Sequence, residues 1–180
     1  MIATLGWDPS TVGAAWAELL VSPARREFVG TGMCKTEREI EARLRKFSVD
    51  RTAANFDRDI VIGIEMPMGI HTARDDAKTA RARGVYLMKT RGVASSIATM
   101  ARMLGFETVI ELSPGQCRSA IGLGRSSTNA GVSHALRVVV PSWPARSNDH
   151  NRDAAVCAFA AATRRGFHAR VQDVQGRNRA

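Results

Sequence analysis

Short apolar runs without a helical period open the chain and predict strands. They cover residues 2–7, 14–21 and 26–33, and Gly13 and Pro23 fall in the turns between them. Glycine weakens a strand interior and proline removes a ladder hydrogen bond, so both residues suit such turns. The first part of the chain is therefore predicted to form three consecutive strands.

Helical spacing begins after these strands. Thr36 starts a capping-box pattern, and Ile40, Leu44 and Phe47 recur at helical spacing, which predicts an amphipathic helix over 37–47. Further strands are predicted at 59–65 and 106–112, and further helices at 72–90, 93–104, 114–121, 129–139 and 150–165. Three strands followed by alternating helices and strands predict an α/β fold with a mixed central sheet flanked by helices.

The length and composition of the chain fit one domain. Of its 180 residues, 44% are hydrophobic and 24% are charged, which is usual for a globular protein with a sizeable core. We expect a single domain over 1–165 and a basic tail over 166–180 that need not be ordered. No apolar run reaches membrane-spanning length and no signal-peptide pattern opens the chain, so no membrane partner is expected.

The cysteines bear on the compartment in which the protein acts. Cys34, Cys117 and Cys157 are odd in number, widely spaced and form no C-x-x-C pattern. This excludes a disulfide scaffold and a zinc ribbon, and it fits a reducing compartment. We expect a cytoplasmic protein, either bacterial or encoded by a phage and acting in an infected cell.

The charge balance is strongly basic. Lys and Arg total 26 against 17 Asp and Glu, which gives a formal net charge of +9. An excess of this size indicates a polyanionic partner such as nucleic acid. The alternative is a basic surface that binds nothing in particular.

Four side chains are candidates for chemistry: Asp8, Glu65, His150 and Asp153. Asp8 follows the first predicted strand and Glu65 ends the fourth, at the strand ends where α/β sheets place ligands. A carboxylate after an apolar strand is costly to bury unless it is paired or bound to metal. His150 and Asp153 are three residues apart on the last predicted helix and share a face. Converging carboxylates of this kind can bind two divalent metal ions, which activate water and stabilise the leaving oxygen of a phosphodiester.

Each candidate also has a plainer interpretation. Asp8 before Pro9 suits a turn, and Glu65 could simply emerge into solvent. His150 could be a metal ligand, a general acid or base, or a helix-terminus residue. We expect Asp149 to be the N-cap of the last helix. Whether Asp149 or His150 is the fourth active-site residue is left open at this point.

Three segments together resemble a known family. They are Gly-Trp-Asp-Pro-Ser around Asp8, Ile-Glu at 64–65 and His-Asn-Arg-Asp-Ala-Ala at 150–155. In order, spacing and context they resemble the RuvC Holliday junction resolvases over residues 1–165. The resemblance implies a ribonuclease H-like fold, a homodimer and cleavage of branched DNA (four-way junctions, forks or flaps). It also implies dependence on Mg²⁺, with Mn²⁺ as a substitute and two ions per site.

The resemblance further assigns roles to individual residues. Asp8, Glu65 and Asp153 would be the metal ligands, and His150 stands where the family carries Asp or His.

The chain also departs from the family pattern. Met68 stands where many members carry an aromatic residue that stacks at the junction centre. The family's basic contacts are matched loosely by Arg118 and Arg125. Met68, Arg118 and Arg125 are therefore the predicted DNA contacts.

Two other functions are compatible with parts of the sequence. A phosphotransferase-like ATP-binding protein would explain Asp8-Pro-Ser-Thr11 after a strand, but the chain lacks a second lobe and a second Asp-Gly loop. A non-catalytic nucleic-acid-binding domain is disfavoured by the intact acidic residues.

A stripe of small residues predicts either a dimer contact or packing against the sheet; it consists of Ala73, Ala77, Ala80 and Gly84.

Overall fold

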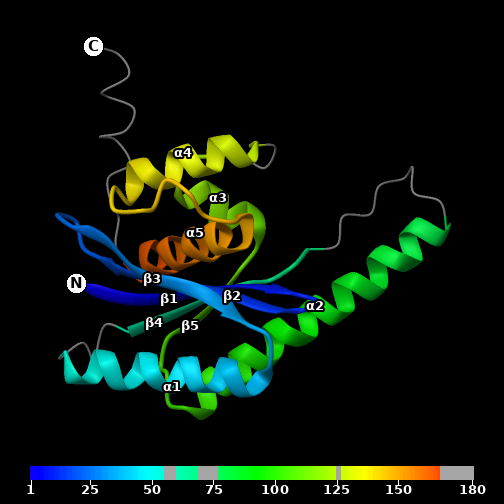
Figure 1. Ribbon diagram of the computed structural model, residues 1–180, viewed down its shortest axis with the longest axis horizontal. Coiled ribbons are helices and arrows are strands. Elements are labelled where there is room, and N and C mark those ends of the chain that lie inside the picture. Colours follow the sequence, from blue (N-terminus) through cyan, green and yellow to red (C-terminus); the bar gives the residue numbers. More distant parts are fainter. Residues whose placement is uncertain (55–59, 69–76, 125–126, 167–180) are drawn as a thin grey trace.

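A five-stranded mixed sheet separates two helical layers (Figure 1). The computed structural model describes residues 1–54, 60–68, 77–124 and 127–166. In chain order the elements are β1 (Ile2–Ser10), β2 (Gly13–Val21), β3 (Arg26–Cys34), α1 (Glu37–Ala53), β4 (Ile60–Glu65), α2 (Ala77–Met103), β5 (Val109–Leu112), α3 (Pro114–Ala120), α4 (Asn129–Val139) and α5 (Asp149–Arg164). The sheet has the order β3-β2-β1-β4-β5. The first three strands pair antiparallel, and β4 pairs parallel with both β1 and β5.

Each face of the sheet has its own core. Leu5, Trp7, Ile62 and Ile64 belong to the core under α1 and α2. Helix α5 packs on the opposite face, and α3 and α4 lie over it (Figure 1). Ten residues of α5 are buried, because sheet and helices enclose it on most sides.

Two paired glycines allow α5 to lie directly on the central strands. Gly6 of β1 is in register with Gly63 of β4. A Cβ atom on Gly6 would come within 2.7 Å of the Ala158 Cβ and closer still to the Ala154 carbonyl oxygen. A Cβ on Gly63 would lie 2.8 Å from the Ala161 Cβ. Only glycine leaves room for this helix at this distance.

The same register decides where the strand-end carboxylates point. Side chains alternate between the two faces of a strand. Asp8 is two residues beyond Gly6, and Glu65 is two residues beyond Gly63, so both face the side of the sheet that carries α5.

Two sequence expectations need correction. Strand β1 does not end at residue 7 but continues to Ser10, because Asp8 and Pro9 pair with β2 across the hairpin. Pro9 is tolerated because β1 pairs with β4 only as far as Trp7. The helices expected at 72–90 and 93–104 are one helix, α2, and residues 72–76 lie outside the described part of the chain.

Helix α2 is continuous but only half of it packs on the body. Its C-terminal half buries Ala94, Ile97 and Ala101 against the sheet. Its N-terminal half extends away from the sheet (Figure 1) and exposes Tyr86 and Met88. None of the helices in the described part of the chain is long and apolar enough to cross a membrane.

Candidate active site

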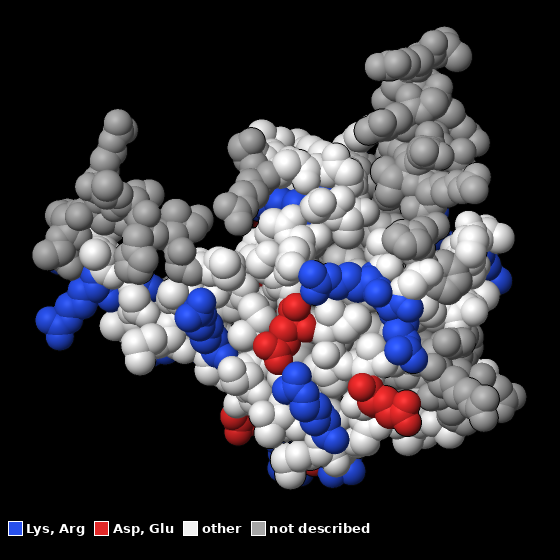
Figure 2. Space-filling view, turned by 180° about the vertical axis from the view of Figure 1, so that it is seen from behind, with Lys and Arg blue, Asp and Glu red and all other residues white. Residues whose placement is uncertain are grey.

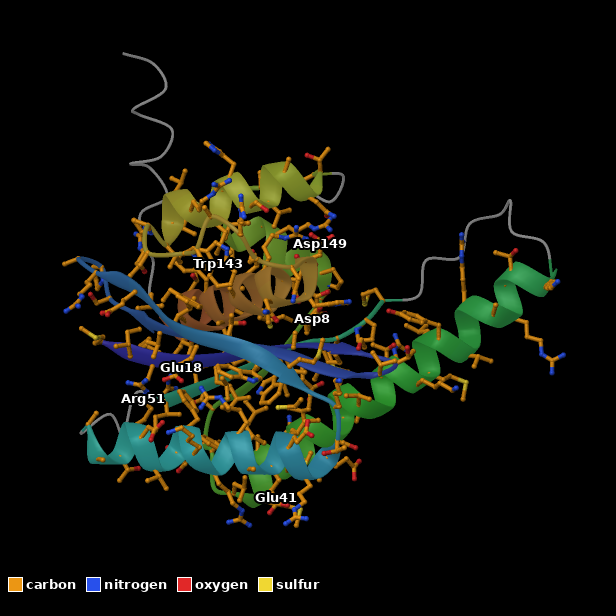
Figure 3. All side chains as sticks on the ribbon, viewed as in Figure 1. Asp8, Glu18, Glu41, Arg51, Trp143 and Asp149 are labelled. Atoms are coloured by element: carbon orange, nitrogen blue, oxygen red, sulfur yellow. The ribbon has the colours of Figure 1, made fainter. Side chains whose placement is uncertain are left out.

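Asp8 and Glu65 lie at the same end of the sheet, beneath the start of α5. In Figure 3, Asp8 lies at the end of the sheet below Asp149, the first residue of α5. Burial raises the pKa of Asp8 to about 6, while hydrogen bonding and the charge of His150 oppose this rise and the charge of Asp153 adds to it. The carboxylates on β1 and α5 are therefore close enough to repel each other.

Glu65 has a strongly raised pKa. Burial raises its pKa to about 8, and the negative charges of Asp8 and Asp153 contribute further. The Cys117 thiol hydrogen-bonds to Glu65, and the positive charge of Arg118 also favours its ionised form. Three carboxylates from β1, β4 and α5 thus form one electrostatically coupled group, which is a feature typical of functional sites.

His150 contacts Asp8 directly. Its Nδ1 atom lies 2.7 Å from Asp8 Oδ2, and its side chain is 52% exposed. The imidazole is therefore in contact with both the buried carboxylate and solvent. Asn148, whose side chain accepts a hydrogen bond from the Asn151 backbone N–H, is the N-cap of α5. The expectation that Asp149 is the N-cap is wrong, because the helix begins with Asp149 itself.

Asp149 and Asp153 share a basic partner that the sequence reasoning missed. Arg152 donates from Nε to Asp153 Oδ1 at 3.0 Å and from Nη1 to Asp149 Oδ1 at 2.6 Å. Burial raises the pKa of Asp153, and the charge and hydrogen bond of Arg152 oppose that rise. The signal in the sequence is an arginine that directly precedes Asp153 and the Ala-rich run of the helix. The structure brings His150, and not Asp149, into contact with Asp8.

The three predicted DNA contacts, Met68, Arg118 and Arg125, lie in different parts of the chain. Met68 follows β4 and is 53% exposed. Arg118 lies on α3, where its charge acts on both Glu65 and Asp153. Arg125 lies outside the described residues.

The acidic group offers suitable donors for a divalent cation, but they do not stand at ligand spacing. Carboxylate oxygens are what Mg²⁺ and Mn²⁺ prefer, and three mutually repelling carboxylates would be stabilised by a cation between them. Within the described part of the chain, no three His, Cys, Asp or Glu side chains are arranged to hold a metal ion. Asp8 is paired with His150 and Asp153 with Arg152. The carboxylates are therefore of the right chemical type for such a metal ion. To bind it, Asp8 would have to leave His150 and Asp153 would have to leave Arg152.

No family model matches the sequence, and no curated protein matches it.

Solved structures define the class. The chain has the ribonuclease H-like fold, as the resemblance of the three short segments predicted. Among the solved structures that match are two of RuvC from Thermus thermophilus, one of them in complex with a Holliday junction substrate. Both superpose with a TM-score of 0.62 at 16% sequence identity. They cover 91% and 92% of this chain, and the matched regions span 96% and 97% of the RuvC chains.

Proposed function

We propose that the protein is a structure-selective endonuclease that cleaves Holliday junctions and related branched DNA by two-metal-ion hydrolysis. One observation carries the proposal. Three coupled carboxylates from β1, β4 and α5 meet at one end of a sheet, in a fold that matches a junction-bound resolvase over most of its length.

Each side chain of the site has a part in this reaction. Asp8, Glu65 and Asp153 would hold the metal, Mg²⁺ or Mn²⁺. The bound ions would supply an activated water and charge stabilisation for the leaving oxygen. Glu65 must lose its proton to bind a cation, and its raised pKa makes that step dependent on pH near neutrality. His150 is half exposed beside Asp8, where it can accept or donate a proton at Nε2 while Nδ1 faces the carboxylate.

The rest of the surface suits a polyanion. The chain carries a formal net charge of +9. Figure 2 shows Lys and Arg side chains at several places on one face of the molecule, with acidic side chains lying among them. Arg118 would contact phosphate next to the acidic group, and the exposed Met68 would touch bases near the branch point.

Cleavage of labelled DNA tests the proposal. Four-way, flap and linear DNAs of the same arm sequence are incubated with the protein and Mg²⁺ or Mn²⁺, with EDTA and the Asp8→Asn variant as controls. We expect cuts near the branch point of the four-way DNA, none in the linear DNA and none in either control. Equal cleavage of linear DNA would overturn the structural selectivity. No cleavage of any DNA, together with thermal stabilisation by ATP and not by Mn²⁺, would favour the phosphotransferase-like alternative.

A further inference from the structure

Arg152 places a positive charge inside the acidic group. Its side chain is only 3% exposed. Its Nε and Nη2 atoms each lie 3.0 Å from Asp153 Oδ1. Its charge also acts on Asp8 of β1, the strand on which α5 packs. The guanidinium is therefore a cation already present next to two of the three carboxylates that would bind metal.

A second set of contacts also holds this guanidinium. Nη1 donates to Asp149 Oδ1 at 2.6 Å, and Nη2 donates to Asn129 Oδ1 at 3.3 Å. Asn129 in turn donates from Nδ2 to Asp149 Oδ2 at 2.8 Å. Because Asn129 belongs to α4 and Asp149 to α5, two helices fix the position of the charge. Arg152 can therefore stay in place if Asp153 turns away from it.

A purely structural role does not account for all of these contacts. A buried guanidinium needs partners, since an unpaired buried charge is costly. Asp149 and Asn129 already supply a carboxylate and an amide oxygen. The remaining contact is made to Asp153, the residue on α5 that a metal ion would require.

We propose that Arg152 is a positioning residue that serves as an internal counter-cation of the acidic site. In the metal-free protein Arg152 is paired with Asp153. When the divalent ion binds, Asp153 leaves Arg152 and contacts the ion. Arg152 therefore competes with the ion for Asp153 and sets how tightly the ion binds. The inference rests on the proposed function, because it takes Asp153 as a metal ligand. Unlike the proposed function, the inference predicts the direction in which metal affinity changes when Arg152 is replaced.

Binding of Mn²⁺ to the full-length protein without DNA tests this inference. The dissociation constant is measured from the loss of the free Mn²⁺ signal in electron paramagnetic resonance. Arg152→Met removes the charge and should bind Mn²⁺ about tenfold more tightly, since a unit charge a few ångströms from a carboxylate is felt strongly. Arg152→Lys keeps the charge and should stay within about twofold of the wild type.

The matched control removes an equal charge elsewhere. Arg102 pairs with Glu111 on the surface, and Arg102→Met should leave the dissociation constant unchanged. An unchanged or weaker affinity in a folded Arg152→Met variant would overturn the inference. Equal tightening in the Lys variant would do the same, because the effect would then come from lost geometry and not from lost charge.

Asp149→Asn provides a second variant if Arg152→Met does not fold. Asp149 is exposed, so its replacement should leave the fold intact. Arg152 would then rely more on Asp153, and Mn²⁺ binding should weaken about threefold; tighter binding would count against the inference. Wild-type protein that binds no Mn²⁺ would overturn the proposed function, and the inference with it. If the wild type binds Mn²⁺ and no Arg152 variant changes the dissociation constant, the inference is overturned while the proposed function stands.

Discussion

Asp8 combines burial, a histidine contact and two acidic neighbours. Its carboxylate would attract metal, but it repels phosphate when no metal is present. We therefore expect Asp8→Asn to abolish cleavage and to leave junction binding intact or stronger. Asp153→Asn and Glu65→Gln should behave in the same way. The measurement pairs a cleavage assay in Mg²⁺ with a gel-shift assay in EDTA. Cleavage that survives in Asp8→Asn would remove the two-metal mechanism altogether.

His150 should respond differently from the acidic residues. It touches Asp8 through Nδ1 and keeps half of its side chain in solvent. Because a carboxylate at this position could also bind metal, we expect His150→Asp to retain measurable activity. His150→Ala should lose about 10²–10⁴-fold if the imidazole carries a proton, as single-turnover rates would show.

Asp149→Ala is the informative comparison for this position. Asp149 hydrogen-bonds to Arg152 and Asn129, whereas Asp8 hydrogen-bonds to His150. Its activity at saturating Mg²⁺ should stay near that of the wild type. An inactive Asp149→Ala beside a nearly normal His150→Ala would show that the fourth position has been assigned to the wrong residue.

The sequence could indicate the candidate residues but not their partners. Strand ends and an i, i+3 pair single out Asp8, Glu65, His150 and Asp153, and the structure brings them to one end of the sheet. That they act in catalysis stays a prediction. The contacts made by Arg152 depend on how α4 meets α5, and no local pattern encodes that meeting.

The glycines of β1 and β4 decide how closely α5 can approach the sheet. Gly6→Ala would force its new Cβ against the backbone of α5, and helix or strand would have to move. We expect a loss of about 1–3 kcal/mol or more in the free energy of unfolding, from overpacking. Chemical denaturation measures it.

Gly92→Ala is the matched control for Gly6→Ala. Gly92 lies in α2, and a Cβ there would meet no described atom within 4 Å. Alanine is the better helix former, so this variant should be stabilised by up to about 1 kcal/mol. A Gly6→Ala variant as stable as the wild type would mean that α5 can move away from β1 without cost.

Periodicity predicted most elements well, and where it failed the reason is tertiary. The three opening strands and α1, with Thr36 as its N-cap, follow from local patterns. The expected division of α2 is wrong because Thr90, Ala94 and Ile97 form one buried series across the supposed gap. The extension of β1 to Ser10 depends on pairing with β2, which a strand read in isolation does not reveal.

The acidic group should make the metal-free protein sensitive to alkali. Folding raises the pKa of Asp8 from 3.8 to about 6 and that of Glu65 from 4.5 to about 8. The folded state therefore binds more protons than the unfolded chain between these values, and its stability falls as pH rises through them. The melting temperature in EDTA should decrease from pH 5 to pH 9, and saturating Mn²⁺ should reduce the decrease.

Glu65→Gln isolates the upper part of this pH range. The variant has no carboxyl group to ionise at position 65, so its melting temperature should change little above about pH 7, where Asp8 has already lost its proton. Glu41→Gln removes an exposed carboxylate that pairs with Arg45, and it should keep the wild-type profile. The same decrease in Glu65→Gln as in the wild type would assign the effect to another group.

The projecting half of α2 offers a surface for a second copy of the chain. Tyr86 is 53% and Met88 75% exposed, and a Cβ on Gly84 would meet no described atom within 4 Å. Gly84, the last residue of the small-residue stripe, therefore does not pack against the sheet. We expect a dimer, which would also match the two-fold symmetry of a four-way junction.

Light scattering at micromolar concentration tests this expectation. Met88→Asp should shift the protein toward the monomer. Met103→Asp changes a residue that is 81% exposed at the other end of α2, and it should leave the dimer intact. A monomeric wild type, with and without junction DNA, would contradict the expected dimer.

The enclosure of α5 has a consequence for synthesis. This helix begins at Asp149, so it leaves the ribosome after every strand of the sheet has been made. Until it docks, the glycine-lined face of β1 and β4 lacks its cover, and His150 and Asp153 are missing from the site. A nascent or prematurely terminated chain thus lacks the largest part of one core and half of the proposed active-site residues together. Because two of the proposed active-site residues and the cover of one core arrive with the same helix, an incomplete copy would lack the proposed activity and a closed core together.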